Sequence, residues 1–206
     1  MQTYIATLIG QSPISFGRYH NTEKKPREAA DDFEERTWHM RLHTDSEGNS
    51  MIPPMAFKNC LSMAAKKLGM PVPGKARRTF TAIFLSGIMV VEHAPVLAPE
   101  GKKSKQAKLD DYRKETLFVS ANGKSGQGTG TRVMRHFPTL DTWVTQVEIH
   151  VVDPAITHDI LLEHLDFAGK MVGVGRFRPE NGGFYGRFKT EALELVSDDT
   201  LEEAAE

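Results

Sequence analysis

A change of hydrophobic period between residues 142 and 168 constrains the fold of this chain more than any other feature. From 142 to 152, apolar or β-branched residues take every second position: Trp143, Thr145, Val147, Ile149 and Val151. This alternation predicts a strand with one buried face. The following residues instead repeat at three- and four-residue spacing: Ile160, Leu161, His164, Leu165 and Ala168. They predict an amphipathic helix, capped by Asp153-Pro154 or Thr157 and ended by Gly169.

Weaker patterns place further elements on both sides of this pair. Alternation over residues 2–9, ended by Gly10 and Pro13, predicts a strand. Apolar spacing predicts a helix over 54–68, with proline tolerated in its first turn. The apolar run 79–91 predicts a buried strand pair or a bulged strand with a break at Gly87. Shorter strands are predicted over 116–120 and 185–195, and another could lie over 37–43.

Two long polar segments interrupt these elements. Residues 17–50 are mostly charged and are expected to be exposed. The stretch 95–113 contains Lys102, Lys103, Lys105 and Lys108 and is typical of a mobile basic loop. Four glycines within residues 122–130 predict a second flexible segment. We therefore expect insertions at about 17–50 and 93–141.

The predicted order of elements is the βαββαβ frame of a ferredoxin-like or RNA-recognition fold. The expected fold class is α+β: an antiparallel sheet with two helices, long basic insertions and a C-terminal glycine-rich loop. A chain of 206 residues can bury a real core without metals or disulfides. Residues 1–196 are therefore expected to form a single domain, followed by an acidic disordered tail at 197–206.

The net charge of −1 conceals an uneven distribution. The last ten residues carry five acids and no base. Without them, 26 basic residues face 22 acidic ones, so residues 1–196 carry a balance of +4. The tail is expected either to be simply solvated or to compete with nucleic acid for a basic surface.

Several function classes are not favoured by the composition. The single cysteine, Cys60, allows no disulfide framework and no cysteine-based zinc site, which is typical of a reducing, intracellular setting. We expect a soluble, cytoplasmic protein, because the N-terminus lacks a basic leader and no apolar run approaches about 18 residues. His39 and His43 are four residues apart, as are Asp159 and Glu163, but neither pair has a third ligand at a recognised spacing. No metal or other cofactor is expected.

A glycine-rich loop at residues 173–188 is the strongest indication of function. It holds five glycines, three arginines and four aromatic residues. Glycine allows close backbone approach, arginine donates forked hydrogen bonds to phosphate, and aromatic rings stack on unpaired bases. An ordinary hairpin connection with surface arginines is the alternative, and Phe184 and Phe188 are expected in the core. The segment Gly123-Lys124-Ser125 lacks the upstream glycine of a nucleotide-binding P-loop.

Three segments together resemble the RAMP superfamily, the repeat-associated proteins of CRISPR effector complexes. Residues 52–61 resemble the entry to the first helix of these proteins, residues 10–16 the segment after their first strand, and 173–188 their glycine-rich loop. The three segments cover about a sixth of the chain. Within the superfamily the chain is most similar to the backbone subunits that line up along a guide RNA, and to short phage-borne relatives.

The resemblance implies which residues contact nucleic acid. It places Arg18, Lys58 and the three loop arginines on phosphates, with Phe177 and Tyr185 near bases. Arg132 and Arg135 follow the flexible segment 122–130, which could belong to an inserted thumb formed by 18–45 or 95–138. The complete predicted set is Arg18, Lys58, Arg132, Arg135, Gly173, Gly175, Arg176, Phe177, Arg178, Gly182, Gly183, Tyr185 and Arg187.

The resulting hypothesis is a non-catalytic protein that binds single-stranded RNA, such as a guide RNA, and forms a homo-oligomer along it, with other effector subunits as further partners. Single-stranded DNA is an equal candidate, because no reader of the 2′-hydroxyl can be identified. One alternative is a phage or plasmid accessory protein that uses the fold to bind protein partners or to interfere with CRISPR. A second is a RAMP-type endoribonuclease, with His20, Asp31 and Asp32 in the first insertion.

Overall fold

A computed structural model describes residues 1–75, 77–100, 103–120 and 131–196 of the chain. The strands are β1 (Gln2–Gly10), β2 (Ile14–Ser15), β3 (Met51–Ile52), β4 (Ile88–Met89), β5 (Ala94–Glu100), β6 (Lys103–Gln106), β7 (Arg113–Ser120), β8 (Arg132–Leu140), β9 (Val144–Val151) and β10 (Phe188–Leu195). The helices are α1 (Ala30–Thr37), α2 (Pro54–Leu68), α3 (Phe80–Ser86) and α4 (His158–Met171), with short 3-10 helices η1 (Trp38–Arg41), η2 (Leu109–Asp111) and η3 (Pro179–Asn181).

The main sheet has the predicted ferredoxin-like topology. Its strand order is β10-β1-β9-β5-β3, and every pairing is antiparallel. Helix α2 follows β1 and α4 follows β9, so β1, β5, β9 and β10 are the four strands of the βαββαβ frame. The second strand of the frame is broken, because β4 pairs with β9 at Val151 and β5 pairs with it at Thr145. The predicted fold class is confirmed.

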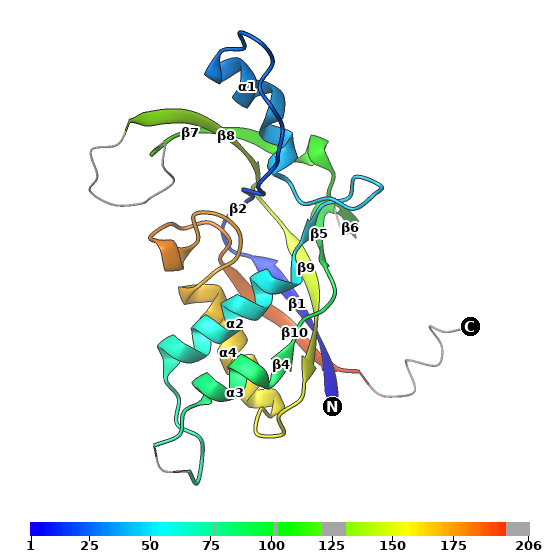
Figure 1. Cartoon of the computed structure of the whole chain (residues 1–206). Helices are drawn as coiled ribbons and strands as arrows, with labels where there is room; N and C mark the ends of the chain where they lie inside the picture. Colours follow the sequence, from blue (N-terminus) through cyan, green and yellow to red (C-terminus); the bar gives the residue numbers. More distant parts are fainter. Residues whose placement is uncertain (76, 101–102, 121–130, 197–206) are drawn as a thin grey trace.

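Helices α2, α3 and α4 cover one face of this sheet, and the core lies between the two layers (Figure 1). The alternation that predicted β9 is confirmed, since Trp143, Thr145, Val147, Ile149 and Val151 are all buried. Trp143 also explains why residue 10 is a glycine, because a Cβ at that position would lie 2.3 Å from the indole nitrogen. The end of β1 is therefore fixed against the start of β9.

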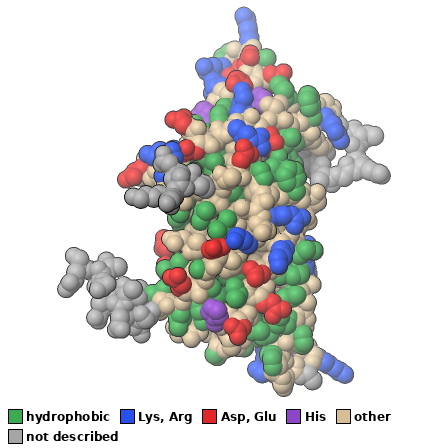
Figure 2. Space-filling model, turned by 180° about the vertical axis from the view of Figure 1, so that it is seen from behind, with side chains coloured by type: hydrophobic (Ala, Val, Ile, Leu, Met, Phe, Trp, Pro, Cys, Tyr) green, Lys and Arg blue, Asp and Glu red, His purple; other side chains and the backbone are tan. Residues whose placement is uncertain are grey.

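The opposite face of the main sheet is open and carries a mixture of side-chain types (Figure 2). Ile5 of β1 lies in register between Glu148 of β9 and Glu194 of β10, and Thr7 lies between Gln146 and Ala192. These positions offer carboxylates and no aromatic rings. RNA-recognition domains instead stack bases on aromatic residues of the sheet, so a polyanion is not expected on this part of the face.

A second sheet, in the order β2-β8-β7, is built mainly from the later insertion. Strands β7 and β8 pair from Arg113 with Thr139 to Ser120 with Arg132 and form a long ribbon. Helix α1 and η1 of the earlier insertion lie against β8, so the two candidate thumb segments lie together (Figure 1). The predicted flexible segment 122–130 and the acidic tail 197–206 fall outside the described residues.

The sequence prediction for residues 79–91 was wrong. This run forms α3 and the short strand β4 instead of a strand pair. Its β-branched and aromatic residues favour a strand locally, but Phe80, Ile83 and Phe84 are spaced three and four apart and are buried together. Packing on one helical face therefore overrides local propensity.

The two insertions are also more ordered than their composition indicates. Helix α1 lies just before residues 37–43, where a strand was expected. In that range the structure has the 3-10 helix η1, Trp38–Arg41, instead of a strand. The predicted mobile loop 95–113 contains β5, β6 and η2. It is fixed by a few buried residues, among them Ala107 and Tyr112, whose hydroxyl donates to Ser50 Oγ at 2.8 Å. A few apolar residues at separated positions pack this segment against the rest of the protein. The high lysine content of the segment does not indicate this packing.

Cys60 lies in the core and has no redox partner, because it is the chain's single cysteine. Burial raises the pKa of its thiol to about 12, so the thiolate that would bind metal or attack a substrate is not formed near neutral pH. In the described part of the chain, no helix is long and apolar enough to cross a membrane.

His164 gives the core a pH dependence that can be measured. Its ring is fully buried on α4 and stacked on Phe84 with 4.1 Å between ring centroids. Burial lowers the pKa of His164 below its ordinary value. Protonation therefore favours the unfolded chain, so stability is complete above about pH 6.5 and falls as the pH drops below that value. Denaturant unfolding at pH 7 and pH 5 should show a smaller loss for His164→Leu than for the unmodified protein. Because His20 and His43, whose pKa values burial also lowers, remain in both proteins, equal losses would contradict the assignment.

Candidate nucleic-acid interface

The glycine-rich loop is held against the segment that follows β1. Arg176 N donates to Ser15 O at 2.8 Å, Gly186 N donates to Pro13 O at 2.7 Å, and Arg187 N donates to Ser12 Oγ at 2.9 Å. The loop also closes on itself, through Val174 N and Gly186 O at 3.0 Å. Two segments that are about 160 residues apart, and that both contribute to the family resemblance, therefore form one structural unit.

The loop glycines are explained by the folding of the loop. A Cβ at Gly183 would lie 1.7 Å from Phe177 O, so only glycine fits there. Gly175 has φ +78° and Ser15 O at 2.7 Å from its would-be Cβ. Gly173 and Gly182 also have positive φ, at +73° and +77°. The glycine content alone is thus no evidence for a bound ligand. Evidence for a ligand site has to come from the charged side chains.

A cavity of about 370 Å³, here called the loop pocket, lies where this unit meets the start of α2. Its lining includes Gly17, His43, Pro53, Arg176, Phe177 and Arg178. The first turn of α2 has no side-chain cap. Pro53 and Pro54 carry no N–H and Ala56 N donates to Pro53 O, so the positive end of the helix dipole is the main contribution of α2 to the potential of the pocket. Burial lowers the pKa of His43, which keeps its ring neutral.

Arg176 is the central cation of the loop pocket. Its guanidinium carbon lies 3.5 Å from the ring centroid of Phe137 and 4.4 Å from that of Phe177. No ion pair to Arg176 is found among the residues that the structure describes. Burial, followed by the nearby charges of Arg41 and Arg135, lowers its pKa to about 10. The side chain is still charged at neutral pH and is held in place without a carboxylate.

The other two loop arginines serve the loop itself. Arg178 forms an ion pair with Glu180, Nη2 to Oε2 at 3.2 Å, and its Nη1 donates to Gly175 O at 3.4 Å. Arg187 donates to Lys170 O in the last turn of α4. Of the three loop arginines that the resemblance placed on phosphates, Arg176 alone has its charge without a close anionic or carbonyl partner in the described chain.

The aromatic residues of the loop are placed differently from the prediction. Tyr185 is 6% exposed and its hydroxyl donates to Glu115 Oε1 at 2.6 Å, so its ring is not free to stack on a base. Phe184, expected in the core, is 56% exposed, which corrects that prediction. Phe188 is buried, as predicted. Tyr185, bonded to Glu115, is therefore the buried ring of this neighbouring pair, and Phe184 is the exposed one.

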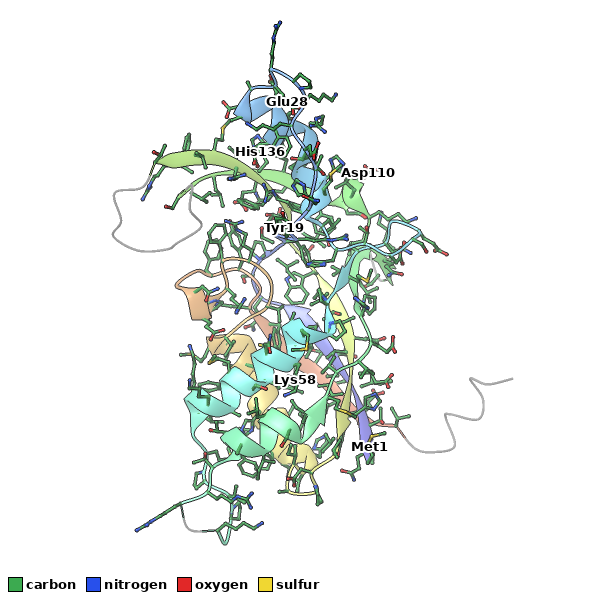
Figure 3. All side chains as sticks on the ribbon, in the orientation of Figure 1. Met1, Tyr19, Glu28, Lys58, Asp110 and His136 are labelled. Atoms are coloured by element: carbon green, nitrogen blue, oxygen red, sulfur yellow. The ribbon has the colours of Figure 1, made fainter. Side chains whose placement is uncertain are left out.

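Lys58 has a structural position on α2 (Figure 3). Its Nζ donates to Phe84 O, Leu85 O and Ser62 Oγ, each at 2.9 Å, and so caps the C-terminal end of α3. Burial lowers its pKa. The phosphate contact that the resemblance implied would require Lys58 to leave these carbonyls.

The remaining predicted residues lie away from the loop pocket. Arg18 is exposed and lines a separate cavity of about 670 Å³ together with Tyr19, His20 and His39 (Figure 3). Arg132 is exposed at the far end of β8. Arg135 forms an ion pair with Glu34 of α1. The predicted set is therefore divided among three places, and Arg176, Phe177, Arg178 and Gly175 are the members that line the loop pocket.

Sequence reasoning missed the residues that support Arg176 from behind. Glu34 of α1 is 3% exposed and accepts hydrogen bonds from Arg41 Nη2 at 2.9 Å and from Arg135. The guanidinium carbon of Arg41 lies 5.1 Å from the centroid of Phe137, the ring on which Arg176 also stacks. We call Glu34, Arg41, Arg135, Arg176 and Phe137 the arginine cluster. These residues come from both insertions and the loop, so no local sequence pattern connects them.

Metal ligands do not gather anywhere in the described ranges, where no three His, Cys, Asp or Glu side chains are close enough to hold an ion. The groups at the interface are stacked and partly buried guanidinium groups, the His43 ring and one exposed aromatic ring, Phe184.

The strand order and the placement of the helices define an α+β protein with a ferredoxin-like frame. No protein-family model and no curated protein matches the sequence. Among solved structures, the crystal structure of Cmr6 from Pyrococcus furiosus is similar, with a TM-score of 0.51 and 12% identity over 91% of this chain and 97% of that chain. A chain of a Type IV-B CRISPR complex gives a TM-score of 0.45 and 13% identity over 95% of this chain and 91% of that chain. The chain therefore shares its fold with Cmr6.

Proposed function

We propose that the protein binds single-stranded RNA through its phosphate backbone at the loop pocket, without catalysis, as a CRISPR-associated protein that repeats along the strand. The observation that carries the proposal is Arg176, a charged guanidinium without an ion pair in the described chain, which contacts two aromatic rings at the wall of a cavity. Fixed guanidinium groups of this kind donate paired hydrogen bonds to phosphate.

Three further features favour a polyanion at the same place. The first turn of α2 lines the pocket with Pro53 and Ala56, so the positive end of the helix dipole lies beside it. Phe177 contributes a half-buried ring beside Arg176, and Phe184 an exposed ring on the same loop. The fold is that of Cmr6, a subunit of CRISPR machinery, which supports a role beside guide RNA and other effector subunits. None of these features reads base identity, so little sequence preference is expected.

The test is binding of a labelled 20-nucleotide uridine RNA and its DNA counterpart at several salt concentrations. One phosphate contact per protomer, at Arg176, predicts a log–log slope near −0.7 for each bound protomer, or roughly a 2.5-fold loss of affinity between 50 and 200 mM salt. Purified protein should also carry nucleic acid, visible as a raised ratio of absorbance at 260 and 280 nm. A clean monomer that binds neither polymer would contradict the proposal and favour an accessory protein that binds proteins.

A second candidate function has one observation in its favour. His20 and His39 line the same cavity as Arg18, and burial followed by the charge of Arg41 lowers the pKa of His20. A neutral histidine beside a second histidine and an arginine is an arrangement that can cleave RNA by acid–base catalysis. The same labelled RNA decides this point, since intact RNA after long incubation with and without divalent metal excludes cleavage.

A further inference from the structure

The arginine cluster carries an excess of positive charge. Three guanidinium groups, those of Arg41, Arg135 and Arg176, surround one carboxylate, Glu34, so these side chains together carry +2. The neighbouring ion pairs, Lys114 with Glu35 and Arg178 with Glu180, balance themselves. Arg41 and Glu34 have side chains that are 13% and 4% exposed, so solvent screens the excess only in part.

Hydrogen-bond donors in the cluster are also unsatisfied. The Nε atoms of Arg41 and Arg176 are buried and have no partner among the described residues. Buried charged donors without an acceptor are rare in native proteins, and an unplaced ion or ligand is one of the standard explanations. The excess positive charge and the unused Nε donors therefore both indicate that the cluster can bind an anionic acceptor.

The geometry of Arg176 limits how such an acceptor can bind. Phe137 lies 3.5 Å and Phe177 lies 4.4 Å from the guanidinium carbon, and the two rings are nearly perpendicular, at 88°. The rings therefore contact the group from two directions, and its buried Nε has no partner in the described chain and remains for an in-plane contact of the kind that phosphate oxygens make. Arg176 is also the member of the cluster that lines the loop pocket, so a ligand in that pocket reaches the cluster through it.

The geometry points to recognition of a dianionic phosphate: the loop pocket takes the phosphomonoester end of an RNA strand in preference to an internal phosphodiester. This inference rests on the proposed function and adds the chemical group that is recognised. A phosphomonoester carries about −1.5 to −2 at pH 7, whereas a phosphodiester carries one charge. In a partly buried site, the ligand whose charge balances the excess of +2 is favoured. A cavity of about 370 Å³ also suits a terminal nucleotide.

The experiment compares three versions of one RNA decamer on the full chain: one with a 5′-phosphate, one with a 3′-phosphate and one with hydroxyls at both ends. AMP and inorganic phosphate are tested as separate probes. We expect at least a tenfold tighter binding of one phosphorylated decamer than of the hydroxyl decamer. Arg41→Gln, which lowers the excess from +2 to +1, should reduce that preference at least threefold. Because the central comparison uses the unmodified protein, it does not depend on the folding of this variant.

The outcomes separate the two proposals. Equal affinity for all three decamers overturns recognition of the strand end and leaves RNA binding standing. Binding of AMP or inorganic phosphate without binding of any decamer overturns the proposed function and retains the cluster as a phosphate site. If none of the probes binds, both proposals are overturned.

Discussion

Arg176→Glu is expected to reduce the affinity for single-stranded RNA at least 100-fold at 50 mM salt. The unmodified side chain is charged, lines the loop pocket and has no competing ion pair in the described chain. Loss of one hydrogen-bonded arginine–phosphate contact costs about 1.5–3 kcal/mol, or roughly 10- to 150-fold, and the new carboxylate adds repulsion. Filter binding or fluorescence anisotropy with the labelled uridine RNA measures the change.

Arg187→Glu is the matched control for this substitution. It lies in the same glycine-rich loop and changes the net charge by the same amount, but its guanidinium contacts Lys170 O at the end of α4. We expect a loss of at most about fivefold, through long-range electrostatics alone. Equal losses in the two variants would mean that RNA responds to overall charge and not to the loop pocket. Thermal melting of both variants checks that the fold is retained.

The parts of the fold that were predicted correctly are those where a local pattern and the tertiary packing agree. Strand β9 alternates because one face is buried against the helices, and α2 begins at Pro54 and ends before Gly69 because both residues suit those positions. The run that became α3 was misread because its β-branched residues favour a strand, while Phe80, Ile83 and Phe84 bury one helical face. Competition between propensity and packing is not visible in a short apolar run.

The candidate site was predicted in part, and for a comparable reason. The loop could be found from its composition, and Arg176 with it. Glu34, Arg41 and Phe137 could not, because the fold brings them to Arg176 from segments about 40 to 140 residues away along the chain. The partners of Arg178 and Arg187 were equally hidden, so arginines that look alike in the sequence have different roles: Arg178 and Arg187 are bonded within the structure, and Arg176 lines the pocket without an ion pair in the described chain.

Glu34→Gln is expected to destabilise the protein by about 3 kcal/mol. It removes the buried carboxylate that pairs with both Arg41 and Arg135. For a chain of this size, that corresponds to a fall in melting temperature of about 6–12 °C. The amide keeps the shape of the side chain, so the change reports the charge. Glu35→Gln is the matched control, because Glu35 is the next residue of α1 and its side chain is 57% exposed in its pair with Lys114. Surface pairs contribute little, so its melting temperature should stay close to that of the unmodified protein.

The contrast between the two glutamates also separates stability from binding. Glu34→Gln raises the charge excess of the arginine cluster from +2 to +3, so the folded variant should bind RNA at least as tightly as the unmodified protein. A variant that melts normally but loses RNA would instead place Glu34 among the groups that contact the ligand.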